Sequence, residues 1–264
     1  VERGADPDVA SSTDDRTPRV IGKGSVKLRS YFKTVGLFCE RFELAKRPDH
    51  KTETSIVRRA SNLNGAPVAL KFMANHDQFE CEVRARRGLD NKFVVGVLAT
   101  SVEIGADAFA AAAAKLRYGP HGIVMEAADR NLAVVMLQEK PSVDEIAATM
   151  RQLAACLEHL HVVGRRIHGD FKPLNAMRME TNEWKLIDLD ASALIDVERA
   201  GSKFSSAYSP PELARRLFLP TDDPSTPSLL AHPSFDVWCF GVVLYEMLAR
   251  DVLFRRDSSN DNIK

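Results

Sequence analysis

The feature that most constrains this chain is a polar loop sequence followed closely by two aspartates. The stretch HGDFKPLN begins at His168, and the stretch DLD begins at Asp188. A protein that catalyses phosphoryl transfer positions the attacking hydroxyl, neutralises the phosphate charges and binds magnesium ions, and it contributes little covalent chemistry of its own. Asp170 can accept the proton of a hydroxyl, and Lys172 can contact the transferring phosphate. Asn175 and Asp188 can hold metal ions, so the two stretches together predict a phosphoryl-transfer site.

Composition and charge argue against several other classes of protein. The 264 residues are 45% hydrophobic and 27% charged, as in an ordinary soluble globular domain. The 36 basic and 36 acidic residues cancel, so no overall field attracts nucleic acid or an anionic membrane. No apolar run approaches the roughly 20 residues that span a bilayer, and no basic and then apolar leader follows Val1. We expect no nucleic-acid partner, no membrane span, and a chain excised from a longer protein.

The cysteines point to a reducing compartment. They lie far apart and form neither a CxxC pair nor a metal-ligand spacing: Cys39, Cys81, Cys156 and Cys239. This pattern is typical of buried thiols in the cytosol. We therefore expect a cytoplasmic, intracellular protein.

The chain divides into a short polar segment and two larger parts. Residues 1–18 are polar and Asp-rich and are predicted to be a linker. Within them, ERGADPD from Glu2 resembles the loop that ends an ankyrin repeat, although so short a match also arises by chance. Residues 19–125 carry short apolar runs typical of strands, and residues 126–264 become helix-rich. That order predicts a two-lobed α+β domain.

Some elements of the first lobe can be placed from periodicity. A helix is expected between Asp77 and Arg87. Strands are expected at 67–73, 94–98 and 122–126. The basic, polar stretch 47–65 and the alanine-rich stretch 105–120 do not fit a compact meander, and both are predicted to be surface insertions.

Two longer helices are expected in the second lobe. Ser142 and Glu145 form a capping box for a helix with one apolar stripe, which ends near Gly164. A second helix, from about Phe235 to Leu248, is apolar almost all round. We expect this second helix to be central to the core.

Further motifs, in the same order along the chain, resemble those of the protein kinase family. They are VALK ending at Lys71, EVRAR from Glu82, IVMEAA from Ile123, YSPPE from Tyr208 and DVWCFG from Asp236. With HGDFKPLN and DLD, the resemblance covers roughly residues 19–256. It implies a two-lobed protein kinase-like fold with a small β-rich N-lobe at 19–125. The hinge and helical C-lobe at 126–264 would be incomplete, because family members continue through further helices after the central one.

The resemblance implies how ATP is bound. Lys71 would grip the α and β phosphates and pair with a glutamate of the regulatory helix. Glu82 has the family's spacing for that glutamate, and Glu80 is the alternative. Asn175 and Asp188 would hold Mg²⁺ or Mn²⁺.

The adenine pocket is implied in the same way. The side chain of Met125 would close the back of this pocket, and Glu126 and Ala128 would form backbone hydrogen bonds with adenine. Further contacts with the nucleotide are implied for Ala69 and Met177.

Substrate class is implied by one position. A lysine two residues after the catalytic aspartate accompanies serine/threonine kinases in this family, and Lys172 follows Asp170 by two. Ser205 stands where a family hydroxyl ties these two residues to the substrate-binding loop. Asp236 would anchor the catalytic loop from below.

The phosphate-covering loop departs from the family pattern. Gly22 and Gly24 match only the first two glycines of GxGxxG, and they lie about twice the usual distance before Lys71. Either an insertion explains the distance and Gly22 and Gly24 contact phosphate, or the loop lies near 34–39 and is almost free of glycine.

Two more departures flank the catalytic residues. Gly169 replaces the arginine with which many members grip a phosphorylated activation segment, so activity is expected not to wait on that phosphorylation. Asp190 replaces the glycine of the metal-binding motif, which would stiffen the segment and place a further carboxylate near the metals.

Two functions follow as alternatives. The intact set of Lys71, Glu82, Asp170 and Asp188 favours an ATP-dependent serine/threonine kinase that acts on an unidentified protein substrate. The phosphate-covering loop with few glycines and the aspartate at 190 favour a pseudokinase that serves as a nucleotide-binding or protein-interaction scaffold.

Overall fold

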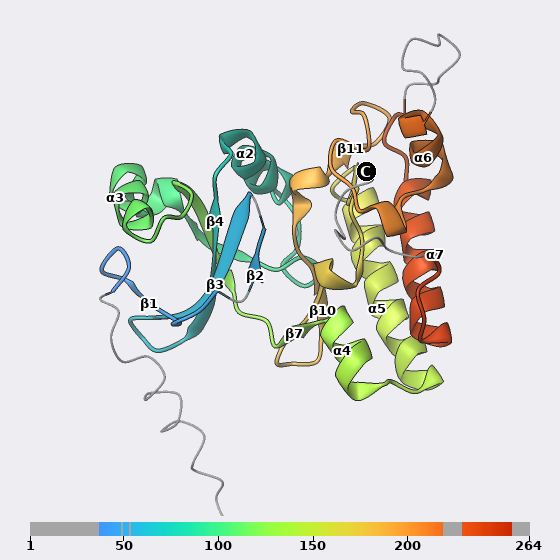
Figure 1. The fold of residues 1–264 in the computed structure, drawn as a ribbon, viewed down its shortest axis with the longest axis horizontal. Helices are drawn as coiled ribbons and strands as arrows, with labels where there is room; N and C mark the ends of the chain where they lie inside the picture. Colours follow the sequence, from blue (N-terminus) through green and yellow to red (C-terminus); the bar gives the residue numbers. More distant parts are fainter. Residues whose placement is uncertain (1–36, 49, 53, 219–228, 255–264) are drawn as a thin grey trace, which may run out of the picture.

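The structure, a computed structural model, describes residues 37–48, 50–52, 54–218 and 229–254. Two lobes lie beside one another (Figure 1), one built on a β-sheet and the other mainly of helices. This is the α+β arrangement that the sequence predicts. The linker at 1–18 and the candidate loop glycines Gly22 and Gly24 lie outside the described residues.

The small lobe is built on an antiparallel sheet of strand order β1-β3-β4-β6-β5, with β2 paired to β3. The strands are β1 (Phe42–Leu44), β2 (His50–Lys51), β3 (Ser55–Asn62), β4 (Pro67–Met73), β5 (Val97–Thr100) and β6 (His121–Glu126). In β4, Val68, Leu70 and Phe72 are buried on one face. Because side chains alternate along a strand, Lys71 lies on the opposite face.

One predicted strand is displaced. The apolar run 94–98 contributes only its end to β5, since Val94 instead makes an isolated bridge to Leu186 of the large lobe. Val94 is buried with residues of that lobe. An apolar run alone does not tell which core will bury it.

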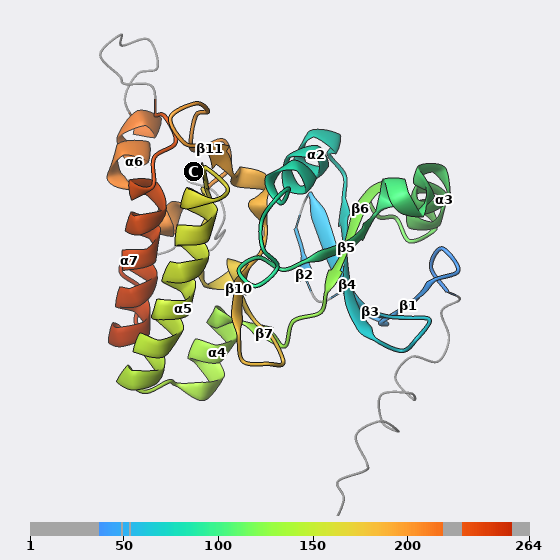
Figure 2. The ribbon, with the colours of Figure 1, turned by 180° about the vertical axis from the view of Figure 1, so that it is seen from behind.

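Two helices accompany the sheet. The predicted helix at 77–87 is confirmed as α2 (His76–Ala85), which Asn75 caps through a bond from the Gln78 amide. The other helix, α3 (Ser101–Lys115), lies at the far end of the small lobe, whereas α2 lies between the sheet and the large lobe (Figure 2).

Helix α3 shows that the prediction of a surface insertion at 105–120 is wrong. Phe109 and Ala113 are fully buried. Phe109 approaches the sheet so closely that a Cβ on Gly122 would lie 2.2 Å from its ring. Small residues give a weak amphipathic pattern, yet they let a helix pack closely, so the buried side was not visible in the sequence.

The prediction of an insertion at 47–65 is also wrong. This stretch contains β3, which lies between β1 and β4 in the sheet. Its Arg58 is buried and donates from Nη1 to the Tyr118 hydroxyl at 3.3 Å, with the guanidinium 5.9 Å from the ring centre. Arg59, one residue on, is exposed. A polar stretch can form an inner strand because arginine packs its aliphatic stem and its planar head against apolar groups.

The large lobe is mainly helical. Its helices are α4 (Leu132–Glu139), α5 (Val143–Val162), α6 (Pro211–Phe218) and α7 (Ser234–Ala249). Its short strands are β7 (Arg130–Asn131), β8 (Arg166–Ile167), β9 (Ala176–Arg178), β10 (Trp184–Leu186) and β11 (Ala193–Leu194). The described part of this lobe also contains the 3-10 turns η1 (Pro173–Asn175), η2 (Leu189–Ala191) and η3 (Ser206–Tyr208).

The two long helices agree with the sequence to different degrees. Helix α5 is confirmed, with its capping box and its buried apolar stripe. Helix α7 is present, but it is not buried all round within the described residues: Cys239 and Val243 are buried, whereas Val237 and Leu248 are 62% and 52% exposed. None of the helices in the described part of the chain is long and apolar enough to cross a bilayer.

The cysteines are all free. Cys156 and Cys239 are buried as expected, but Cys39 and Cys81 are only half-buried. Burial raises the pKa of Cys156 to about 12, so this thiol is inert at neutral pH.

The packing of α3 can be tested with Phe109→Ala. Phe109 is fully buried and stacks edge-on against Phe38 with ring centres 5.0 Å apart, so its removal should cost about 3–5 kcal/mol of stability. Val102→Ala, at an exposed position of the same helix, should change stability by less than about 0.5 kcal/mol. Urea unfolding monitored by circular dichroism measures both; equal losses would mean that α3 is not part of the core.

Candidate active site

The two lobes meet at one buried ammonium group. Lys71 of β4 contacts Glu82 of α2 and Asp188 of the large lobe, each at 2.5 Å between Nζ and a carboxylate oxygen. Lys71 and Glu82 are 6% and 0% exposed, whereas Glu80 is exposed. Of the two glutamates left open by the sequence, Glu82 is therefore the one that pairs with Lys71.

The charges of this group depend on one another. Burial by itself would lower the pKa of Lys71, but the Asp188 and Glu82 carboxylates outweigh it and raise that pKa above its ordinary value. Burial likewise opposes the charge of Asp188, and the ammonium groups of Lys71 and Lys203 hold its pKa well below the usual range. Lys71 and Asp188 are therefore both charged at neutral pH.

The backbone at Asp188 is unusual. This residue follows β10 and lies in the left-handed region, with φ 65°. This conformation is unfavourable for a non-glycine residue, and such strain persists only where surrounding contacts fix it. Here the contacts are those from Lys71 and Lys203 to the two carboxylate oxygens.

The loop 168–175 gathers the next set of groups. Lys172 Nζ lies 3.0 Å from Asp170 Oδ2 and donates to Ser205 Oγ at 2.6 Å. Asn175 Nδ2 donates to the Asp170 carbonyl at 2.8 Å. The other carboxylate oxygen of Asp170, Oδ1, is buried and has no hydrogen-bond partner within the described residues, so it can accept a bond from a substrate hydroxyl.

A fully buried aspartate holds this loop from below. Asp236, in the first turn of α7, accepts from the backbone amides of His168 at 2.7 Å and Gly169 at 3.0 Å. His161 Nε2 lies 2.7 Å from the same carboxylate. A carboxylate with several donors is stable even when buried. This is the anchoring geometry expected for Asp236.

The structure gives Gly169 a steric role. Its φ is 80°, and a Cβ there would lie 2.3 Å from the Ala191 carbonyl oxygen. An arginine at this position would need both a strained backbone and movement of the segment that carries Asp188 and Asp190. The close approach of the two segments therefore requires glycine here.

A small apolar cluster lies around Met125. Met125 is buried in it together with Ile123 and Met179, and Ala128 and Met177 pack against it. Ala69 lies opposite Met125 in the β4–β6 pair.

Glu126, the expected hinge residue, is partly engaged within the protein. Its amide donates to the Gly96 carbonyl at 3.1 Å, and its carboxylate accepts from Lys185 Nζ at 2.9 Å.

Arg59 joins the small lobe to the chain just beyond the hinge. Its Nη2 donates to the Asp129 carbonyl at 2.8 Å. On β3, Arg59 lies opposite Ala69. Nothing in the sequence singled out this link, since it joins residues that are 70 apart.

Sequence reasoning also missed Lys203. Its Nζ donates to Asp188 Oδ2 at 3.0 Å and to both oxygens of Asp190, at 2.8 and 2.9 Å. A lone lysine between two motifs carries no local signal, so only the fold could reveal this contact. Burial and the Asp188 charge raise the pKa of Asp190, against the lowering effect of Lys203.

Asp190 differs from what the sequence predicts. It lies within η2, and its φ is not positive. The residue with positive φ is Asp188, so an aspartate at 190 in place of the family's glycine causes no backbone strain. The effect of this replacement is electrostatic.

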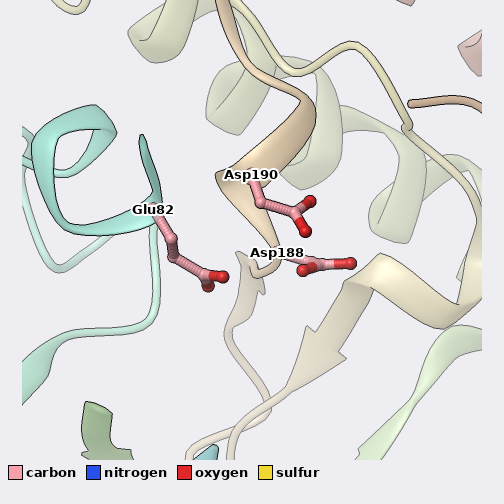
Figure 3. A group of neighbouring side chains, drawn as sticks. All are labelled: Glu82, Asp188 and Asp190. Carbon is pink, nitrogen blue, oxygen red and sulfur yellow. The ribbon is translucent and has the colours of Figure 1, made fainter. Parts of the chain in front are cut away.

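Three carboxylates converge from two elements (Figure 3): Glu82 from α2, and Asp188 and Asp190 from the segment after β10. One oxygen of each lies within 4.8 Å of the others. Oxygen ligands of this kind suit Mg²⁺ or Mn²⁺. Asn175 adjoins this segment, because its backbone carbonyl accepts from the Ile187 amide at 3.0 Å. The oxygen donors present therefore suit a divalent cation, and at present the ammonium groups of Lys71 and Lys203 contact the carboxylates of Asp188 and Asp190.

Of the two alternatives for the phosphate-covering loop, Gly22, Gly24 and residues 34–36 lie outside the described residues. Within the described residues, β1 and β3 form a hairpin that precedes β4, and residues 45–54, which include β2, form the loop that connects them. The described loop residues include no glycine but several basic side chains: Lys46, Arg47, His50 and Lys51.

His50 brings this loop to the same cavity as Lys172 and Ser205. It lines a cavity of about 680 Å³ together with Lys172, Ser205, Leu137 and Arg250. The cavity therefore adjoins the loop that carries Asp170.

Comparison with known proteins agrees with this geometry. The protein kinase domain family matches residues 53–264, so most of the loop 45–54 lies outside the match. Hormonally up-regulated neu tumor-associated kinase of Mus musculus is 33% identical over 138 residues, which cover 50% of this chain and 18% of that protein. Mitogen-activated protein kinase 12 of Danio rerio is 24% identical over 232 residues, which cover 88% of this chain and 60% of that protein.

The human Mitogen-activated protein kinase 12 is 25% identical over 207 residues, which cover 76% of this chain and 51% of that protein. The chain thus spans less than two thirds of the length of each of these relatives. The family match extends over most of the chain and includes both Lys71 and Asp170. By this match, and with the two-lobed fold described above, the chain belongs to the protein kinase family.

Proposed function

We propose that this chain is an active, ATP-dependent serine/threonine kinase that transfers the γ-phosphate to hydroxyls of a protein substrate. The observation that carries the proposal is the joint geometry at the cleft. Lys71 pairs at once with Glu82 and Asp188, while Asp170 keeps one buried oxygen without a partner in the described part of the chain. A phosphoryl-transfer site needs both features together.

Each group has a definite task in this proposal. Asp170 accepts the proton of the attacking hydroxyl through Oδ1, and Lys172 contacts the transferring phosphate. Lys71 binds the α and β phosphates and is held in place by Glu82. Asn175 and Asp188 would hold Mg²⁺ or Mn²⁺, which when bound supplies positive charge to the phosphates.

The adenine would lie against the small apolar cluster. Met125, Ala69 and Met177 would contact the adenine ring. The Glu126 carbonyl would accept a hydrogen bond from the ring, and the Ala128 amide would donate one to it.

The proposed lobe boundaries are residues 19–125 for the small lobe and 126–264 for the large lobe. Residues 1–18 remain a proposed linker and possible end of an ankyrin repeat.

The serine/threonine class is supported by Lys172 and Ser205. Their hydrogen bond of 2.6 Å ties the loop 168–175 to the segment before Tyr208, as the resemblance implies for a serine/threonine kinase. A protein substrate could enter through the cavity of about 680 Å³ beside Lys172, where Leu174 is exposed.

A pseudokinase is the second candidate. It is supported by the glycine-free loop 45–54 and by Lys203, whose ammonium engages an oxygen of Asp188. Such a protein would bind nucleotide or partners without transferring phosphate.

Asp170→Asn tests catalysis directly. Loss of the general base should lower the rate of phosphate transfer to a generic basic protein by about two to four orders of magnitude. Asp107→Asn, the same change at an exposed site in α3, should leave the rate unchanged. Radiolabelled ATP with Mg²⁺ or Mn²⁺ measures the rate, and phosphoamino-acid analysis should find phosphoserine or phosphothreonine. A wild-type protein inactive with both metals would favour the pseudokinase.

Glu82→Gln and Glu80→Gln form a matched pair for nucleotide binding. At a concentration of ATP–Mg²⁺ 100 times its Kd, binding should stabilise the wild-type protein by about 2.7 kcal/mol. Glu82→Gln should lose most of this stabilisation because Lys71 loses a charged partner, and Glu80→Gln should keep it. The thermal shift with and without ATP–Mg²⁺ measures the difference. Equal shifts in the two variants would show that Glu82 does not contribute to nucleotide binding.

A further inference from the structure

The contact made by Lys203 has the geometry of a bound cation. An ammonium group donates three hydrogen bonds, and the donors of Lys203 face three carboxylate oxygens, one of Asp188 and two of Asp190, at 2.8 to 3.0 Å. Its positive charge thus lies between two adjacent carboxylates. Small cations in proteins are held in the same way, by converging carboxylate oxygens.

Both oxygens of Asp188 are engaged by ammonium groups. Oδ1 accepts from Lys71 at 2.5 Å, and Oδ2 accepts from Lys203 at 3.0 Å. A magnesium ion binds its oxygen ligands at about 2.0–2.1 Å and demands near-octahedral geometry. An ion on Oδ2 would lie next to the Lys203 ammonium and be repelled by it, so ion and ammonium compete for this oxygen.

Asp190 explains why the ammonium of Lys203 remains beside Asp188. Two buried carboxylates side by side repel each other unless a cation lies between them. Asp190 has a side chain only 4% exposed, and Lys203 contacts both of its carboxylate oxygens. A glycine at 190 would leave Lys203 with Asp188 alone, so the replacement at 190 creates the site that holds this lysine.

Lys203 can leave without disturbing the core. Its side chain is 37% exposed, so a change of rotamer can carry the ammonium into solvent. The neighbouring residues are held independently: Phe204 packs against the core of the large lobe, and Ser205 is bonded to Lys172. The contact is therefore reversible at the level of one side chain.

We propose that Lys203 determines the divalent-cation requirement of this site. Its ammonium takes the cation position between Asp188 and Asp190 and must be displaced before a metal–nucleotide complex can use Asp188. The proposal rests on the nucleotide site proposed above. It predicts that the protein needs more Mg²⁺ than the same site without the lysine.

The test compares Lys203→Met with Arg199→Met. Arg199 is exposed and lies in the same segment, so it controls for loss of one positive charge. The measurement is the Mg²⁺ concentration that gives half of the thermal stabilisation by ADP. We expect Lys203→Met to lower this concentration at least about tenfold, which corresponds to about 1.4 kcal/mol, and Arg199→Met to leave it unchanged.

Lys203→Arg keeps the charge and guards against a folding artefact. It should retain the wild-type Mg²⁺ requirement, because a guanidinium can also bridge carboxylates. An unchanged or higher Mg²⁺ midpoint in Lys203→Met overturns the proposal, and so does an absence of any Mg²⁺ response in Lys203→Met.

The outcomes also separate this proposal from the proposed activity. A tenfold shift without phosphate transfer supports the role of Lys203 while the proposed kinase activity fails. Phosphate transfer with identical Mg²⁺ midpoints in wild-type protein and Lys203→Met overturns the role of Lys203 and leaves the proposed activity intact.

Discussion

The arrangement of the cleft depends on the ammonium of Lys71. Taking a charge out of water is costly unless partners surround it, and removing one partner of a buried pair leaves the other uncompensated. Lys71 has a partner in each direction, Glu82 of α2 and Asp188 of the large lobe. The position of α2 on the sheet and the strained backbone of Asp188 are therefore parts of one electrostatic unit.

A second constraint shapes the loop 168–175, which carries Asp170 and Lys172. Asp236 fixes its start through the amides of His168 and Gly169. Gly169 then lets the segment at Ala191 approach to a distance that no Cβ would allow. The loop 168–175 is thus held from below by a buried carboxylate, and the glycine at 169 leaves room for the segment that carries Asp188 to lie against it.

Much of the fold could be predicted, because its signals are local. The capping box of Ser142 and Glu145 and the apolar stripe behind it define α5 without reference to the rest of the chain. Burial in the small lobe was harder to foresee. Arg58 is buried by Tyr118, and the alanine-rich α3 is buried through Phe109, and both contacts join residues distant in sequence. A polar strand and a small-residue helix look like surface until their partners are known.

By itself, the sequence determined the family and the identity of the groups at the cleft, since the order and spacing of VALK, HGDFKPLN and DLD are properties of the chain. Only the tertiary structure decided between Glu82 and Glu80 and brought Lys203 to Asp188 and Asp190. The physical reason is that charge pairing and close approach act through space. Motifs record which groups are available, and the packing of distant segments decides which of them meet.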